Sequence, residues 1–255
     1  MKKKVITNAV IVCVALFLLA FASVQFPQLY IKKTHSYQQF DIYSNSKIQE
    51  NTFVKNTLDS VLLNLKRSEF YSPDQKFKLF FVKATSYSKV IEFLGMKNMA
   101  SSKFDSHIYN AEPDFKSGWL IKGYGDLEKL NLVQVITHEC VHSQMYPEYS
   151  TLGFMKTQSW INEGYSEYIS YAPKRKEQHQ SILDLMVSIE NSNGVWLKTT
   201  YGNYSPRFYL KSRLIVEYLI EVKKMTVKDI INDTSLSPEV VYEDIKKWYN
   251  VQEPF

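Results

Sequence analysis

The spacing of hydrophobic residues divides the chain into three regions. An apolar run extends from Val5 to Phe26. Between 46 and 125, a helical period over residues 48–65 is followed by short apolar runs typical of strands, the strongest being Phe77 to Val82. From 126 onward the period is helical almost throughout. The pattern predicts an α+β fold in which a mixed lobe with a small sheet precedes a helical lobe.

The same signals place the remaining elements. A short helix is expected from Tyr87 to Leu94, where Gly95 stops it, and further strands are expected near 107–109 and 119–123. The helical lobe should contain helices near 126–146, 155–171, 175–191, 206–224 and 237–249. Pro147 disfavours helical geometry at Tyr146, so the first of these helices should end there, with a turn from Pro147 to about Phe154.

The domain organisation follows from these regions. Residues 1–26 form a membrane-directed segment, and the mixed, polar stretch 27–45 has no clear period and is interpreted as a spacer. A single domain is expected over 46–255. Its mixed α/β lobe covers 46–125 and its helical lobe 126–255.

The amino-terminal segment fits two kinds of membrane signal. Lys2, Lys3 and Lys4 precede the apolar run, whose length of about 20 residues suits a signal-anchor that is not cleaved. A signal peptide cleaved near Ala22 is the alternative, because small residues lie there. A buried core helix is less favoured. We therefore expect the domain on the extracytoplasmic side, either anchored to the membrane or secreted.

Composition narrows the candidate partners and the sources of stability. The net charge of +5 falls to +2 without the three terminal lysines (5 − 3 = 2), and no basic stripe interleaved with aromatic residues is present, so nucleic acid is not an expected partner. The two cysteines are Cys13, inside the apolar run, and Cys140. The exported part therefore has no internal disulfide and must be stabilised by packing.

One stretch, VITHECVHSQMYP, carries the chemistry of a metal site. His138 and His142 are four residues apart, so in a helix both rings can point to the same place. Glu139 lies about 100° round the helix, where it can reach a water molecule held by the histidines. Cys140 falls on the opposite side and should be buried in the core. These are the roles of the HExxH pattern, with two metal ligands and a general base.

A third ligand is expected on a second helix. A catalytic zinc ion of this type takes three protein ligands and keeps a fourth position for water. Glu163 is separated from His142 by 20 residues, enough for a second helix to fold back and present its carboxylate. Glu167, one turn further on, could accept the spare ring N–H of either histidine. A solvated helix face is the ordinary alternative for both glutamates. The residues indicate a Zn²⁺ site made of His138, His142 and Glu163.

HExxH followed by Trp-Ile-Asn-Glu-Gly resembles the gluzincin metallopeptidases, specifically the group around aminopeptidase N and leukotriene A4 hydrolase and the smaller peptidase MA-like domains. The resemblance implies a zincin-like fold with an active-site cleft between the lobes, zinc bound by the two histidines and Glu163, and Glu139 as general base. It also places Tyr209 on the family's transition-state tyrosine, although Ser212 stands where glycine is usual. Tyr201 and Tyr204 are the other tyrosines considered for that role.

The expected function is a zinc-dependent peptidase acting on peptides or proteins. The spacing to Glu163 is two residues longer than in the aminopeptidases of this group, and the Gly-x-Met-Glu-Asn segment that grips a free amine is missing, which favours an endopeptidase. The alternatives are a zinc hydrolase of another amide and an inactive, membrane-tethered binding domain. Substrate would pair with an edge strand, for which 107–110 and 118–121 are candidates. His107 is expected on the surface or in a loop and not as a ligand.

Overall fold

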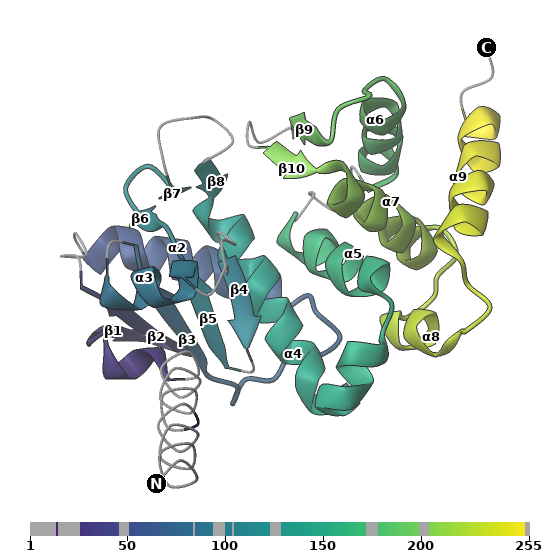
Figure 1. The fold of residues 1–255 in the computed structure, drawn as a ribbon. Helices are drawn as coiled ribbons and strands as arrows, with labels where there is room; N and C mark the ends of the chain where they lie inside the picture. The colour runs from purple at the N-terminus through teal and green to yellow at the C-terminus, as the bar shows by residue number, and fades with distance from the viewer. Residues whose placement is uncertain are drawn as a thin grey trace, which may run out of the picture.

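The computed structural model describes residues 14, 26–45, 51–83, 85–93, 100–103, 105–122, 129–171, 178–198 and 204–252. Within these residues a sheet with flanking helices is followed by a group of packed helices, as Figure 1 shows. This arrangement confirms the predicted α+β fold.

The main sheet has five strands in the order β1-β2-β3-β5-β4. The three inner strands, β2 (Phe40–Ser44), β3 (Phe77–Phe81) and β5 (Ser106–Tyr109), are parallel. The two edge strands, β1 (Lys33–Tyr37) and β4 (Ala100–Lys103), run antiparallel to their neighbours. Because side chains alternate between the faces of a strand, β3 contributes to the core on both faces. The sheet is therefore covered on both sides.

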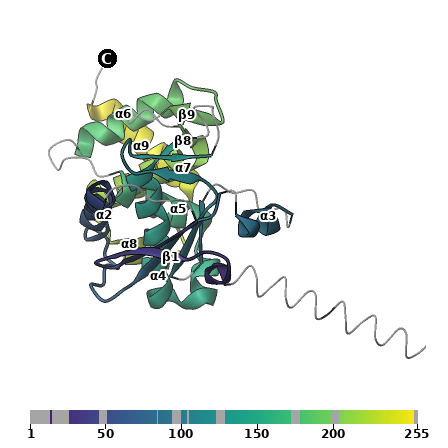
Figure 2. The same ribbon diagram turned by 90° about the vertical axis from the view of Figure 1, so that its left-hand side faces the viewer.

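Helices α2 (Asn51–Leu65) and α3 (Ser86–Phe93) lie on opposite sides of this sheet, as Figure 2 shows. Phe77 and Leu79 join the main core together with Leu58 of α2. Phe80 belongs to a smaller cluster on the other face, with Tyr87 of α3. The apolar run of β3 thus explains why one strand can support two layers.

The remaining described strands form two smaller sheets. β6 (Glu112–Asp114), β7 (Trp119–Ile121) and β8 (Lys129–Asn131) form an antiparallel meander with β7 in the middle. β9 (Trp196–Lys198) pairs antiparallel with β10 (Tyr204–Pro206). A short 3-10 helix, η1 (Pro27–Leu29), precedes β1.

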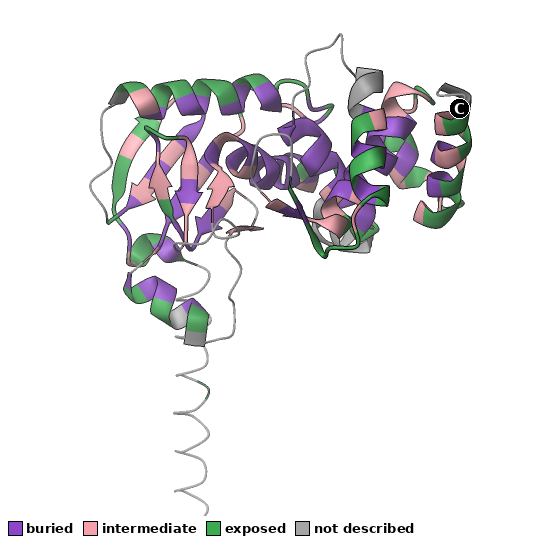
Figure 3. Ribbon diagram, turned by 90° about the horizontal axis from the view of Figure 1, so that it is seen from above, coloured by how far each residue is buried: buried purple, intermediate pink, exposed green. Residues whose placement is uncertain are grey.

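The second half of the described chain is helical apart from the β9–β10 pair. It contains α4 (Leu132–Lys156), α5 (Ser159–Ser170), α6 (Gln178–Glu190), α7 (Arg207–Glu221), α8 (Val227–Asn232) and α9 (Pro238–Gln252). α5 packs against both α4 and α7. Figure 3 shows that these three helices are the most buried part of this half. They carry the residues singled out by the motifs.

The predicted end of the first helix at Tyr146 is wrong, because α4 continues through Pro147 to Lys156. A proline has no N–H for the carbonyl four residues earlier, which here belongs to Ser143. That carbonyl instead accepts a hydrogen bond from Nε2 of Gln75, at 2.8 Å. A side chain from another part of the chain therefore replaces the bond that the proline removes, and the turn to α5 comes later, at Thr157 and Gln158.

The prediction that residues 27–45 form a spacer outside the domain is also wrong. β1 and β2 lie there and belong to the main sheet. Phe40 and Ile42 are buried in the core, whereas Asp41 and Tyr43, which alternate with them, are partly exposed. Buried and partly exposed residues alternate along β2, as in a strand with one buried face. The polar residues of the stretch hid this alternation in the sequence.

The other expected elements are present with shifted ends. The predicted stretches contain α2, β3, α3, β5, β7, α5, α6, α7 and α9. The elements β4, β6, β8, α8 and β9–β10 were not predicted. The expected membrane segment lies outside the described residues except for Val14 and Phe26. In the part of the chain that the structure describes, no helix combines the length and apolar character needed to span a bilayer.

Candidate metal centre

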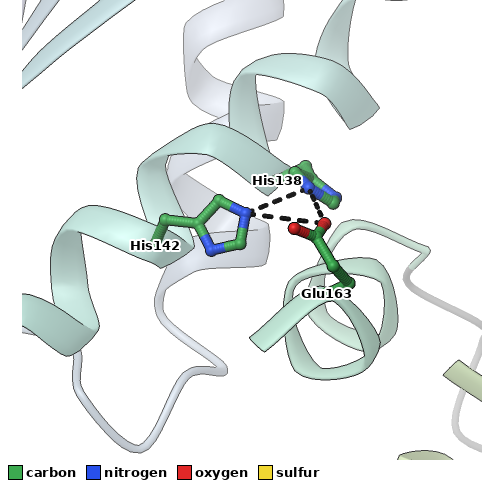
Figure 4. Close-up of side chains that lie close together, drawn as sticks. All are labelled: His138, His142 and Glu163. Carbon is green, nitrogen blue, oxygen red and sulfur yellow. Dashed lines mark hydrogen bonds and ion pairs between the residues drawn. The ribbon is translucent and has the colours of Figure 1, made fainter. Parts of the chain in front are cut away.

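Two histidines on α4 and one glutamate on α5 point toward a common centre, as Figure 4 shows. The Nε2 atoms of His138 and His142 are 3.2 Å apart. Oε2 of Glu163 lies 3.1 Å from Nε2 of His138 and 3.8 Å from Nε2 of His142. The one-turn spacing on α4 and the packing of α5 against α4 together produce this arrangement.

The three groups fit a zinc ion in chemistry and in spacing. Two imidazole nitrogens and one carboxylate oxygen are a ligand set of catalytic zinc sites. Ligand atoms about 2.0–2.1 Å from a tetrahedral ion are about 3.3 Å from one another. The observed separations of 3.1, 3.2 and 3.8 Å lie around that value. His138, His142 and Glu163 can therefore hold one divalent metal ion.

The other nitrogen of each histidine ring is also held. Nδ1 of His138 lies 3.1 Å from Oε1 of Glu167, and Nδ1 of His142 lies 3.2 Å from Oγ of Ser166. Glu163, Ser166 and Glu167 share one face of α5, because they are three and four residues apart. The same helix face thus supplies one ligand and the two contacts that orient both rings.

The charges around the histidines favour a cation. Burial alone would lower the pKa of His138, but contacts with Glu163 and Glu167 outweigh it and raise that pKa well above its ordinary value. Burial and the neighbouring His138 lower the pKa of His142 to about 4. Burial would raise the pKa of Glu163, yet its hydrogen bond to His138 and the charges of both histidines hold it below its usual range. The cluster is poised to take up positive charge.

Glu139 lies beside this centre and is buried. Burial raises the pKa of its carboxyl group to about 7, while the charge of His138 and a hydrogen bond from Ser102 act in the opposite direction. Ser102 belongs to β4, the strand at the edge of the sheet nearest α4. A carboxylate with a pKa near neutrality can both accept and release a proton.

Tyr209 of α7 is part of the same cluster. Its ring stacks on the ring of His138, with centroids 5.8 Å apart and planes 15° from parallel. Its hydroxyl group acts on Glu163 as a hydrogen-bond donor that lowers the pKa of that carboxyl group, and burial together with the charge of Glu163 raises the pKa of Tyr209. Tyr204 is half-buried in β10, and Tyr201 lies outside the described residues. The structure thus brings Tyr209 to the metal ligands.

The close packing of α5 on α7 depends on Gly164, the residue after the ligand Glu163. A Cβ atom at Gly164 would lie 2.4 Å from the backbone oxygen of Ser212 and 2.8 Å from Cγ2 of Val216. Such distances are far below van der Waals contact. The absence of a side chain at this position allows α7, and Tyr209 with it, to approach α5 closely.

Cys140 is fully buried in the main core, on the side of α4 away from the metal centre, as expected. The expectation of a surface or loop position for His107 is wrong. It lies in β5 and is completely buried, with Nε2 at 3.4 Å from Oγ of Ser143. Its place in the middle of the sheet buries the ring and keeps it out of the metal cluster.

The prediction that residues 107–110 or 118–121 pair with substrate is also wrong. β5 has β3 on one side and β4 on the other, and β7 is paired with both β6 and β8. A strand with two neighbours has no free hydrogen-bonding edge. Among the strands that the structure describes, the one with an unpaired edge close to α4 is β4.

Sequence reasoning missed Ser166 and Ser102. Ser166 could have been found, because it lies on the helix face shared by Glu163 and Glu167. Ser102 had no local signal, since its contact with Glu139 depends on the pairing of β4 with β5 and on the packing of α4 against both.

Comparison with known protein families shows a similarity to a metallopeptidase family. A family model described as collagenase, Peptidase_M9, matches residues 126–251. The match supports a zinc metallopeptidase. It covers α4, α5 and α7, and therefore all three candidate ligands as well as Glu139 and Tyr209. Searches of curated proteins and of solved structures found no match.

Proposed function

We propose that the protein is a zinc-dependent endopeptidase of the gluzincin type. The observation that carries the proposal is the convergence of His138, His142 and Glu163 on one point, with Glu139 beside it. The collagenase family match over the same helices supports the peptidase reading. A structural zinc site would be closed by four protein ligands, whereas this set offers three and leaves one position for water.

The chemistry divides among the metal, a base and a hydrogen-bond donor. A zinc ion held by His138, His142 and Glu163 would supply a Lewis acid that lowers the pKa of a bound water molecule toward about 7. Glu139 takes the proton of the attacking water and then passes it to the nitrogen of the leaving amine. Glu167 and Ser166 keep the two imidazole rings oriented throughout.

Tyr209 is proposed to stabilise the developing negative charge on the substrate carbonyl oxygen. Its hydroxyl group acts on Glu163 and its ring stacks on His138, so it would be near a substrate carbonyl bound beside these residues. Its raised pKa keeps the hydroxyl protonated, and therefore a donor, at neutral pH.

Substrate is proposed to bind along the free edge of β4 as an additional strand. β4 is antiparallel to β5 and packs against α4, the helix that carries Glu139, which supports this proposal. An extended peptide there would be held by main-chain hydrogen bonds, without a need for a free terminus. This mode of binding favours endopeptidase over aminopeptidase activity.

The location of the enzyme is proposed from the sequence alone. The lysines and the apolar run before Phe26 favour a domain on the extracytoplasmic side of a membrane, anchored by that run or secreted after cleavage near Ala22. Peptides and proteins outside the cytoplasm would then be its substrates.

The test is cleavage of a mixed peptide library, supplemented with gelatin because the matched family is described as collagenase. The zinc-loaded protein is compared with its Glu139→Gln variant, in which the metal ligands are untouched. We expect internal cleavage by the first and none by the second. Equal cleavage by both, or cleavage by neither, would remove support for the peptidase and favour the amide hydrolase or binding-domain alternatives.

A further inference from the structure

Four polar side chains connect the metal-binding helix to the edge of the sheet. Glu139 and Ser143 are one turn apart on α4 and share a face. Ser102 and His107 are directly opposite each other in the β4–β5 pair, so their side chains lie on one face of the sheet. Figure 1 shows α4 running alongside β4 and β5.

The two pairs meet across the interface. Oγ of Ser143 lies 3.4 Å from Nε2 of His107. Ser102, opposite His107 on the same face of the sheet, is close enough to Glu139 for its hydroxyl group, as a hydrogen-bond donor, to lower the pKa of that carboxyl group. One contact involves the inner strand β5 and the other the edge strand β4. The helix and the sheet are therefore in a fixed register at the position of Glu139.

The position of His107 makes this register rigid. Its ring is completely buried and packs against Phe77 of β3, with ring centroids 5.8 Å apart. A buried, paired strand cannot slide without disrupting the core on that face. Ser102, paired with His107, is consequently held at a fixed place relative to α4.

Ser102 also faces Glu139, a buried carboxylate beside the candidate ligands that is not one of them. A carboxylate has two oxygens, and a hydroxyl donor to one of them restrains the orientation of the group and leaves acceptor capacity for a water proton. A base held in one orientation loses less entropy when it reaches the geometry of proton transfer. The same serine belongs to β4, the edge strand of the described sheet that contacts α4.

We propose that Ser102 is a positioning residue for Glu139. Its hydroxyl group holds the carboxylate of Glu139 at a fixed position relative to β4. The general base is then also fixed relative to a peptide bound along that strand. The inference rests on the proposed peptidase function, which requires Glu139 to act as a base. Ser102 itself takes no part in bond making or breaking.

Neighbouring Ser101 provides a matched control. It precedes Ser102 in β4, is paired with Ile108, and therefore points to the opposite face of the sheet. Both serines are partly exposed. Replacing Ser101 by alanine removes the same hydroxyl group from the same strand without touching Glu139.

The experiment measures kcat, KM and zinc content for Ser102→Ala, Ser102→Val, Ser102→Thr and Ser101→Ala. Threonine and valine have nearly the same shape and both favour strands, so their comparison isolates the hydroxyl group. We expect kcat to fall by about 10-fold or more in the alanine and valine variants, as for a hydrogen bond to a charged group. Threonine should restore most of that loss, and KM and zinc content should not change.

Three results would overturn the inference. These are a kcat of Ser102→Ala within twofold of the parent, equal rates for the valine and threonine variants, or an equal loss in Ser101→Ala. The comparison of the parent with Glu139→Gln keeps the two proposals separate. If the parent cleaves peptides and Glu139→Gln does not, a null result at Ser102 rejects the positioning role alone. If the parent cleaves nothing, the peptidase proposal fails first.

Discussion

Gly164 and Ser212 are in backbone contact across the α5–α7 interface, so close that a Cβ atom at Gly164 would lie 2.4 Å from the carbonyl oxygen of Ser212. The ligand Glu163 precedes the first of these residues, and Tyr209 lies one turn before the second. The contact therefore sets the distance between a metal ligand and the tyrosine that reaches it.

The first prediction concerns Gly164→Ala. A methyl group must push α7 away from α5, which should destabilise the protein by about 1–3 kcal/mol and move Tyr209 away from the site. Because His138 and His142 are on α4, zinc content should be retained while kcat falls by at least about 10-fold. Thermal unfolding, zinc analysis and kinetics of the same preparation check these outcomes.

Gly118→Ala controls for the loss of stability. Gly118 has a φ of 77°, and a Cβ atom there would have nothing within 4 Å, so alanine introduces backbone strain of roughly 1 kcal/mol without a steric clash. If this variant loses as much kcat as Gly164→Ala, the loss comes from general destabilisation and not from the separation of the two helices.

Tyr209→Phe should separate the hydroxyl group from the ring. Phenylalanine can keep the stacking on His138 but has no group to donate to the substrate carbonyl. We expect kcat to fall by about 10²–10³, the usual cost of removing one such donor, with zinc content unchanged. Steady-state kinetics decide the point, and a kcat close to that of the parent would assign Tyr209 to packing.

The contacts behind the histidines should determine metal affinity. Glu167→Ala and Ser166→Ala each remove the partner of one Nδ1 atom. Substitutions of this kind weaken metal binding by about 10- to 100-fold. Competition with a zinc chelator measures the change. Glu148→Ala, which removes an exposed carboxylate paired with Lys228, serves as the control and should bind zinc like the parent.

His107 should make stability depend on pH. Burial lowers its pKa to about 3, below the value of about 6.5 expected in the unfolded chain. The contribution of the neutral ring is therefore complete above pH 6.5 and is lost as the pH falls toward 3, because the unfolded state takes up the proton first. Between pH 7 and pH 5.5 the loss should be about 1 kcal/mol.

Chemical denaturation of zinc-free protein at these two pH values measures that loss. The other titrating groups, including the candidate metal ligands, are the same in the parent and in His107→Gln. Any difference between the two proteins in how the free energy of unfolding changes with pH is therefore due to His107. Parallel pH dependences would show that His107 is not the group responsible.

The metal cluster was predictable because its signals are local. The spacing of His138 and His142 depends only on helix geometry, and the placement of Glu163 needs only a second helix that folds back. The free edge of the sheet was not predictable in the same way. Pairing of β4 with β5 and packing of α4 on both join residues far apart in sequence, and no local pattern encodes such contacts.

Pro147 is a case in which a contact distant in sequence overrides a local rule. Local rules place the end of a helix before a proline, and they hold unless another group satisfies the freed carbonyl. Gln75, far away in sequence, does so here. The strand at Phe40 was missed for a related reason. Its buried residues alternate with partly exposed ones, and the side that is buried is decided by the pairing with β3, which is distant in sequence.

The central claim is that His138, His142 and Glu163 hold one zinc ion, and elemental analysis of the purified protein tests it most directly. The account predicts one zinc per chain in the parent and in Glu139→Gln, and a loss of stoichiometric zinc in His142→Ala. A parent protein without stoichiometric metal even after reconstitution with zinc would contradict the account, as would a His142→Ala variant that keeps its zinc.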